Sequence, residues 1–226
     1  MIPTLIFFLI RRLRVSHPRT AEMLHNIVRK GSRIFVLLML FLALTNFASA
    51  QDSRLHYIIK RNGSEIGKMT MERKIMGEKT SYKLQSEIKT RFIFLITAFG
   101  LEEAVFDKGI LVSSLVYRKM NGNEKANKKM TLAGANYIVT KGSKSEILGH
   151  APIRYTMLNL YDREPENIGQ VYSDNFQQFL NIIKVAPHHY KIRFPDGNYS
   201  EYYYQHGLCT KISLHHSLYT ASFELK

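Results

Sequence analysis

The amino-acid sequence predicts an all-β fold for residues 51–226, with one antiparallel, strongly curved sheet of ten or more strands forming a barrel or half-barrel. Three observations predict it. Apolar and polar side chains alternate strictly along several stretches, which is typical of half-buried strands. Turn signals interrupt the chain roughly every 8–12 residues. Short connections of this kind favour antiparallel pairing of consecutive strands.

Three stretches carry the alternation most clearly. The side chains predicted to face the core are Tyr82, Leu84, Ser86 and Ile88 in residues 82–91, Tyr190, Ile192 and Phe194 in residues 188–194, and Tyr219, Ala221, Phe223 and Leu225 at the C-terminus. A shift of one residue would turn every apolar side chain of such a strand to water. The register of each strand is therefore strongly specified.

Residues that tolerate a positive φ stand between these stretches and predict tight hairpin turns. The predicted turns are Asn62-Gly63, Asp107-Lys108-Gly109, Asn121-Gly122-Asn123, Asp196-Gly197 and, with a weaker signal, His206-Gly207.

Three segments break the alternation. Residues 92–101 are nearly all apolar, which predicts either a strand buried on both faces or a loop folded into the core. Residues 153–160 fit a short helix or a strand, and residues 176–185 also fit either. The helical stripe of the last segment would consist of Phe176, Phe179, Leu180 and Ile183. We expect one or two short helical or irregular segments here, within a single domain.

Residues 1–50 have the three parts of a secretory signal. A basic flank precedes the apolar run at 34–44, and Ala48-Ser49-Ala50 follows it. The run of 11 apolar residues is shorter than the roughly 20 that span a bilayer. We therefore expect cleavage after Ala50, with an uncleaved anchor as the alternative. Met23 opens a compact signal by itself and is the alternative start of the protein.

Residue 51 is Gln rather than Cys, so the expected cleavage site offers no lipid attachment. We expect a soluble exported protein, periplasmic or secreted, that is not a lipoprotein and keeps no stable membrane span after cleavage. Residues 1–50 hold seven of the 32 Lys and Arg and one of the 18 Asp and Glu, so the net charge without them falls from +14 to +8. The remaining cations are spread along strands, and no nucleic-acid partner is expected.

Cys209 is the only cysteine, so the chain has no internal disulfide. Its place in an alternating strand predicts a buried thiol, since a reactive thiol needs a basic and open setting.

The loop Tyr161-Asp162-Arg163-Glu164-Pro165 holds three charges and an aromatic outside any strand pattern. Its guanidinium can bind a carboxylate or phosphate of a ligand or partner. The structural alternative is that both acids hold Arg163 across a turn.

A second candidate surface is the tyrosine-rich strand that contains Tyr202, Tyr203 and Tyr204, with Tyr199 before them. Tyrosine offers an apolar ring and a polar tip, which suits an amphipathic ligand or a partner. Cross-strand packing of alternate rings is the structural alternative.

Recognised catalytic and metal-binding spacings are absent from the sequence. The pairs His188-His189 and His215-His216 cannot each close on one metal, because adjacent strand residues point to opposite faces. A site would need one His from each strand and a third ligand such as Glu201. We expect no metal, no cofactor and no catalytic residues.

Three segments carry a resemblance to a family: IIKRNGSEIG at the start, LYDREP with VYSDNFQQFL, and FPDGNYSEYYYQHGLCTKISL at the end. Over most of residues 54–226 the chain resembles an uncharacterised family, a domain of unknown function, of exported β-rich proteins from Gram-negative bacteria. The opening hairpin is also similar, more weakly, to another family of uncharacterised periplasmic β proteins. The resemblance implies the cell envelope as location and brings no activity.

The leading hypothesis is a non-enzymatic envelope protein whose curved sheet binds an apolar or amphipathic ligand such as a lipid. Strands such as residues 110–117 are apolar on both faces, and a curved sheet can hold one small ligand. If residues 153–185 cover the second apolar face of these strands, no surface is left to bind a ligand. A protein-interaction or scaffold module of the envelope is the alternative. An enzyme of the hydrolase type is the third hypothesis.

Overall fold

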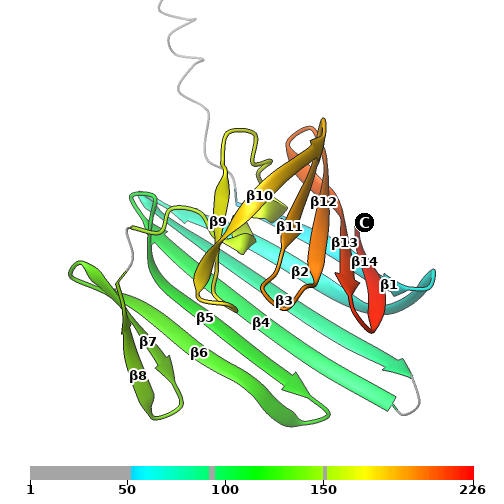
Figure 1. The fold of residues 1–226 in the computed structure, drawn as a ribbon, viewed down its shortest axis with the longest axis horizontal. Helices are drawn as coiled ribbons and strands as arrows, with labels where there is room; N and C mark the ends of the chain where they lie inside the picture. The colour runs from blue at the N-terminus through cyan, green and yellow to red at the C-terminus, as the bar shows by residue number, and fades with distance from the viewer. Residues whose placement is uncertain (1–51, 92–94, 150–151) are drawn as a thin grey trace, which may run out of the picture. The chain divides into compact units, whose positions relative to one another are not determined.

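The computed structural model describes residues 52–91, 95–149 and 152–226. Successive strands pair from β1 to β8 and from β9 to β14, and β1 also pairs with β14 (Figure 1). The result is one antiparallel sheet of fourteen strands whose order runs from β8 through β1 and β14 to β9. The two edge strands do not pair, so the sheet is curved and unclosed. The fold class predicted from the sequence is confirmed. The expected signal segment lies outside the described residues.

The first eight strands are β1 (Ser53–Arg61), β2 (Ser64–Met76), β3 (Lys79–Arg91), β4 (Leu95–Asp107), β5 (Ile110–Met120), β6 (Asn123–Ala133), β7 (Asn136–Lys141) and β8 (Lys144–Leu148). The last six are β9 (Gln170–Ser173), β10 (Gln178–Ala186), β11 (His189–Arg193), β12 (Tyr199–Gln205), β13 (Leu208–His216) and β14 (Tyr219–Leu225). The 3-10 helix η2 (Met157–Tyr161) lies between the two sets.

The predicted hairpin turns have the backbone that their residues favour. Asn62 has a φ of 50° and Gly63 a φ of 78°, so both turn residues between β1 and β2 are left-handed. Two consecutive residues with positive φ also occur in the turns after β4, β5 and β12. Two consecutive positive φ values match the right-handed twist of paired strands. These turns therefore hold the neighbouring registers.

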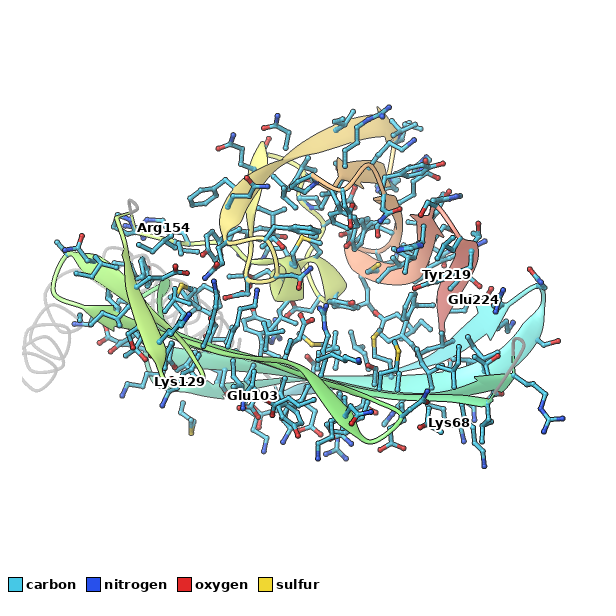
Figure 2. The ribbon with its side chains drawn as sticks, turned by 60° about the horizontal axis from the view of Figure 1, so that its bottom comes forward. Lys68, Glu103, Lys129, Arg154, Tyr219 and Glu224 are labelled. Carbon is cyan, nitrogen blue, oxygen red and sulfur yellow. The ribbon has the colours of Figure 1, made fainter. Side chains whose placement is uncertain are left out.

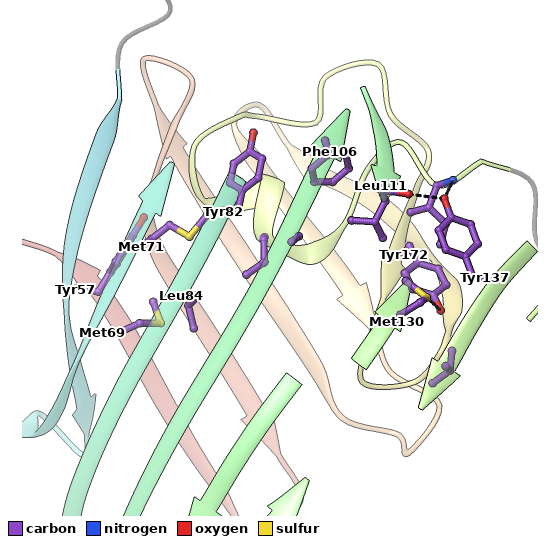
Figure 3. Close-up of a cluster of buried hydrophobic side chains, with 14 of the residues drawn as sticks. Tyr57, Met69, Met71, Tyr82, Leu84, Phe106, Leu111, Met130, Tyr137 and Tyr172 are labelled. Atoms are coloured by element: carbon purple, nitrogen blue, oxygen red, sulfur yellow. Dashed lines mark hydrogen bonds between the residues drawn. The ribbon is translucent and has the colours of Figure 1, made fainter. Parts of the chain in front are cut away.

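Most of the side chains predicted to face the core do so, but Tyr219 at the start of β14 is 41% exposed and its ring stacks on His216. Tyr82 and Leu84 on β3, and Tyr190 and Ile192 on β11, are at most 8% exposed. The buried residues form two hydrophobic clusters, one against β1–β7 and one against β10–β13. Figure 3 shows part of the first cluster, in which side chains of several strands and of the 153–172 region meet. The concave face of the sheet is thus its core.

The segment between β8 and β9 fills part of that concave face. Ile153, Leu158 and Leu160 are at most 3% exposed, and η2 contacts β3, β4, β9 and β13. Residues 153–160 are therefore neither one helix nor one strand: an extended stretch leads into a 3-10 turn. The Thr156 N–H donates to Asn159 Oδ1 over 2.7 Å, which satisfies a backbone donor at the start of the turn.

Buried tyrosines tie this segment to the strands. The Tyr137 hydroxyl donates to the Leu111 carbonyl at 2.9 Å and accepts from the Ile153 N–H at 3.1 Å (Figure 3). The Tyr204 hydroxyl donates to the Leu160 carbonyl at 2.8 Å. Hydrogen bonds of this kind satisfy polar groups that water cannot reach.

Two other open interpretations are resolved. Residues 178–186 form strand β10 rather than a helix, and Ile183 of the proposed stripe is 43% exposed. Phe179 and Leu180 point to opposite faces and join different hydrophobic clusters, because segments pack on both sides of this strand. In the apolar run, residues 92–94 lie outside the described residues. The remainder belongs to β4 and is half-exposed, with Leu95 at 49%, so it is neither a doubly buried strand nor a core loop.

The turn between β9 and β10 meets the inner face of β5–β7 through side chains rather than a strand ladder. Ser114 Oγ donates to Asp174 Oδ1, and Lys128 Nζ donates to the Asn175 carbonyl at 2.6 Å. Lys141 Nζ reaches Gln177 Oε1 at 2.8 Å. We call Asp174–Gln177 with these partners the clasp. It joins the two ends of the curled sheet without closing a hydrogen-bonded barrel.

Candidate functional site

The charged loop predicted as a binding site is bound to the protein itself. Asp162 Oδ2 accepts from Arg73 Nη1 at 2.7 Å, and the Asp162 side chain is 5% exposed. Glu164 is equally buried and accepts from the Tyr190 hydroxyl at 2.9 Å and from His188 Nδ1 at 3.0 Å. The suggested ion pairs across the turn are therefore wrong, since each acid has a remote partner. Burial raises the pKa of Asp162, although Arg73 opposes this.

The two ends of this loop differ in exposure. Tyr161 packs edge-on against Tyr57, with ring centroids 5.7 Å apart. Arg163 is exposed, and its carbonyl accepts from the Tyr155 hydroxyl at 3.0 Å. Arg163 is thus the exposed residue of the loop, while its neighbours anchor it.

Glu164→Ala is expected to destabilise the protein by about 2 kcal/mol, because it leaves the buried Tyr190 hydroxyl without its acceptor. Arg163→Ala is the matched control and is expected to change stability by less than about 0.5 kcal/mol, as exposed sites do. Urea unfolding followed by circular dichroism measures both. Equal losses in the two variants would contradict the anchoring role of Glu164.

The tyrosine-rich strand β12 divides its rings between two faces. Tyr202 and Tyr204 are 4% exposed and belong to the core. Tyr203 points outward and stacks on His189 with centroids 4.2 Å apart, while its hydroxyl donates to Glu201 Oε2 at 3.0 Å. Only Tyr203 of the three is therefore on the surface.

Glu201 is the centre of an outward polar network. Lys191 Nζ lies 3.0 Å from its carboxylate, and the Nε2 atoms of His189 and His215 lie 3.6 and 4.0 Å from it. Burial favours a higher pKa for Glu201, but hydrogen bonds from Lys191 and Tyr203 lower it below its ordinary value. In the part of the chain that the structure describes, no three metal-binding side chains are arranged to hold an ion.

Two neighbouring carboxylates and the cysteine have structural settings. Glu102 points inward to Arg118 at 2.6 Å, and Glu103 points outward to Lys83 at 3.6 Å, so the two carboxylates diverge. Cys209 is fully buried, and burial raises the pKa of its thiol to about 12. A thiol with this pKa stays protonated and unreactive at neutral pH.

A groove of about 500 Å³ lies at one end of β2–β5. Its lining consists of Glu65, Ile66, Gly67, Lys68, Glu87, Ile88, Lys89, Thr97, Ala98, Phe99, Lys119 and Gly122. We call it the β2–β5 groove. Its volume is within the range of small-molecule sites.

The strand registers place this groove on the outer face of the sheet. Lys68, Glu87, Phe99 and Lys119 are direct cross-strand partners in one row across β2, β3, β4 and β5. They alternate with core residues such as Met69. Figure 2 shows Lys68 on the side of the sheet away from β9–β14. An aromatic ring thus lies in a row that ends in a lysine on each side.

Two features shape the groove. Gly67 has no side chain, and a Cβ there would lie 2.2 Å from the Glu87 carbonyl oxygen. Phe99 packs edge-on against Tyr117, with centroids 6.3 Å apart, which continues the apolar surface along β5. The arrangement offers the rings of Phe99 and Tyr117 beside Lys68, Lys89 and Lys119. It suits an amphipathic molecule with an anionic group.

Sequence reasoning missed this site. The sequence feature that could have revealed it is the apolar run through Phe99, because this run breaks the alternation and leaves an aromatic ring on the outer face. The row that gathers Lys68, Phe99 and Lys119 depends on the registers of three strand pairs, which no local pattern gives.

Fold and groove together define an all-β, barrel-like protein with an open groove on the outer face of its sheet. Residues 57–226 match the family described as "Domain of unknown function (DUF6134)", and the chain belongs to that family.

A crystal structure described as a β-barrel-like protein of the domain of unknown function DUF1849 from Brucella abortus is similar in fold. Its TM-score is 0.50 at 10% sequence identity, over 76% of this chain and 95% of that chain. The likeness is one of fold alone. No curated protein matches the chain. Within the described residues, none of the helical structure has the length and hydrophobicity to cross a membrane.

Proposed function

We propose that this protein is a non-enzymatic binding protein of the bacterial cell envelope that holds one apolar or amphipathic molecule, such as a lipid. The observation that carries the proposal is the β2–β5 groove, with the Phe99 ring on the outer face of the sheet beside three lysines. The secretory pattern of residues 1–50 supports an exported, periplasmic or secreted location.

The proposed ligand lies on the outer face rather than inside the curve of the sheet. The concave face holds the protein's own side chains, among them Ile153 and Leu158. The apolar part of the ligand contacts Phe99 and its neighbours. Its anionic group lies near Lys68, Lys89 and Lys119, which are exposed in the structure.

Phe99→Asp is expected to weaken binding of a hydrophobic dye about tenfold or more, because it removes the ring from the groove and adds a repelling charge. Lys119→Glu is expected to weaken binding of a fatty acid but not of a neutral detergent. Lys74→Glu, on β2 and outside the groove lining, is the control. Fluorescence titration measures all three.

Native mass spectrometry of protein purified from the envelope tests the proposal directly. A co-purifying lipid that is lost in Phe99→Asp supports it. The proposal fails if no lipid co-purifies and the dye finds no saturable site.

The second candidate is an interaction or scaffold module, favoured by the exposed Arg163 and the outward Tyr203. Crosslinking in cells is expected to catch one specific partner. Replacing Arg163 and Tyr203 by Ala is then expected to abolish the crosslink while the protein stays folded. An unchanged crosslink would remove these residues from the interface.

A further inference from the structure

Exposed apolar side chains gather at one end of the sheet. Leu95 is 49% exposed, Met120 43%, Leu218 79% and Tyr219 41%. They stand at the start of β4, the end of β5 and the β13–β14 turn. Among the described residues, these are four of the nine large hydrophobic side chains that are exposed.

The strand pairing places these hairpin tips at the same end. Arg91 at the end of β3 pairs with Leu95, and Ala98 of β4 pairs with Met120 of β5. Across β2 and β1, the same end continues to the start of β14, where Ser222 pairs with Lys60. Figure 2 shows Lys68 and Tyr219 toward the same end of the molecule, on the right of the view. We call this edge the basic end.

The charge at this edge is positive. In the hairpins β1–β2, β3–β4 and β5–β6, the connecting residues and the three strand residues on each side of them include seven cations and two acids, Glu65 and Glu124. The cations are Lys60, Arg61, Lys89, Arg91, Arg118, Lys119 and Lys125, of which Lys60 pairs with Glu224 and Arg118 with Glu102.

The opposite end of the same sheet is different. Counted in the same way, its β2–β3 and β4–β5 hairpins carry three cations, Lys74, Lys79 and Lys108, against two acids, Glu78 and Asp107. Lys108 Nζ lies 3.3 Å from Glu78. That end also presents Met76 at 64% exposure. Exposed apolar surface is therefore present at both ends, but the excess of cations over acids is five at the basic end and one at the opposite end.

We propose that the basic end docks on an anionic lipid bilayer. Apolar side chains on hairpin tips enter the interfacial layer, and the surrounding cations bind the headgroups. The proposal goes beyond ligand binding, since docking needs no occupant in the β2–β5 groove. The two are connected in space, because Lys119 and Gly122 line both the groove and the β5–β6 tip. A docked protein would thus present the mouth of its groove to the lipid surface.

Flotation of the purified protein with vesicles tests the proposal. We expect binding to phosphatidylcholine vesicles that contain about a third of phosphatidylglycerol, weak binding to pure phosphatidylcholine, and loss of binding as salt rises from 0.1 to 0.5 M. Replacing Lys119 and Lys125 by Gln is expected to weaken binding about fivefold for each cation removed.

The apolar contribution is tested by Leu95→Asp with Met120→Asp, which is expected to abolish flotation. Met76→Asp at the opposite end is the matched control and is expected to float like the unchanged protein. Circular dichroism shows whether each variant is folded. Flotation that persists in the Leu95 and Met120 variant, or that is equally strong on neutral vesicles, would overturn the proposal.

Two further outcomes separate the alternatives. Sedimentation that shows a dimer broken by the Leu95 and Met120 variant would identify the edge as a contact between two copies and overturn bilayer docking. Vesicle binding by a protein that carries no ligand in native mass spectrometry would support docking and contradict only the groove function. A retained ligand in a protein that does not bind vesicles would support the groove function and contradict docking.

Discussion

Gly67→Ala is expected to destabilise the protein by about 3 kcal/mol, at the upper end of the usual range for overpacking. The added Cβ would lie 2.2 Å from the Glu87 carbonyl oxygen and 2.9 Å from Ile88 Cα. Both obstacles are backbone atoms of the paired strand β3, so no side chain can rotate away. Relief of this clash requires β2 and β3 to separate at Gly67. Gly67 pairs on its other side with Ile59 of β1, next to the bulge between Ile59 and Lys60.

Gly100→Ala is the matched control. Gly100 also lies within a strand and outside the left-handed region, but its added Cβ would meet only Ser86 Oγ, at 2.7 Å. That hydroxyl can move to another rotamer, and Ala costs less conformational entropy than Gly on folding. We expect a change of less than about 1 kcal/mol.

Urea unfolding followed by circular dichroism or tyrosine fluorescence measures both glycine variants, since the chain has 13 Tyr and no Trp. Because Gly67 also lines the β2–β5 groove, the Ala variant is expected to lose dye binding along with stability. Similar stabilities for the two variants would show that β2 moves aside at little cost.

The sequence predicted the strands and their faces because each depends on neighbours within a few residues. The alternation of Tyr82, Leu84 and Ile88 has a period of two, which only a strand can bury on one side. Asn62-Gly63 specifies a turn by its own backbone preferences. These signals are local, so a single sequence contains them.

Distant contacts decide what the sequence left open or predicted wrongly. Residues 176–185 fit a helix or a strand, and Phe179 and Leu180 lie in a strand because different clusters pack on its two faces. Asp162 and Glu164 flank Arg163 in sequence, but Arg73 and Tyr190, far along the chain, provide their partners. The β2–β5 groove likewise needs four strands in register before it exists.

The second large effect is a pH dependence of stability that comes from Asp174 in the clasp. Burial is the main cause that raises the pKa of Asp174 to about 6, and nearby Glu102 adds to it. The hydrogen bond from Ser114 and the charge of Lys128 act in the opposite direction. An unfolded aspartate has a pKa of about 3.9. The folded state therefore holds this proton more tightly than the unfolded state.

The sign of the effect follows from that difference. The stabilising contribution is fully present below about pH 4 and is lost as pH rises through about 6, because the buried carboxylate must then carry its charge. A shift of about two pKa units corresponds to on the order of 3 kcal/mol. Asp174→Asn cannot ionise, so it is expected to be more stable than the unchanged protein at pH 8 and to lose this advantage near pH 4.

Urea unfolding at several pH values between 4 and 8 measures the difference between the unchanged protein and Asp174→Asn. Other groups titrate in both proteins and cancel in that difference. Glu124→Gln, which removes an exposed carboxylate on β6, is the control for the loss of one negative charge outside the clasp. A stability difference between Asp174→Asn and the unchanged protein that is the same at every pH would contradict the assignment.

The location of Asp174 predicts which strands open when this stabilising contribution is lost. Its turn meets β5–β7 only through side chains such as Ser114 and Lys128, so the strands beyond it depend on these contacts. Ionisation of Asp174 is therefore expected to loosen β9 and β10 before the rest of the sheet, since local opening begins where contacts are weakest. Hydrogen exchange, corrected for its intrinsic pH dependence, is expected to be faster in β9 and β10 at pH 8 than at pH 5, and Asp174→Asn is expected to remove that difference. Uniform change across all strands would instead mean that the clasp opens only with global unfolding.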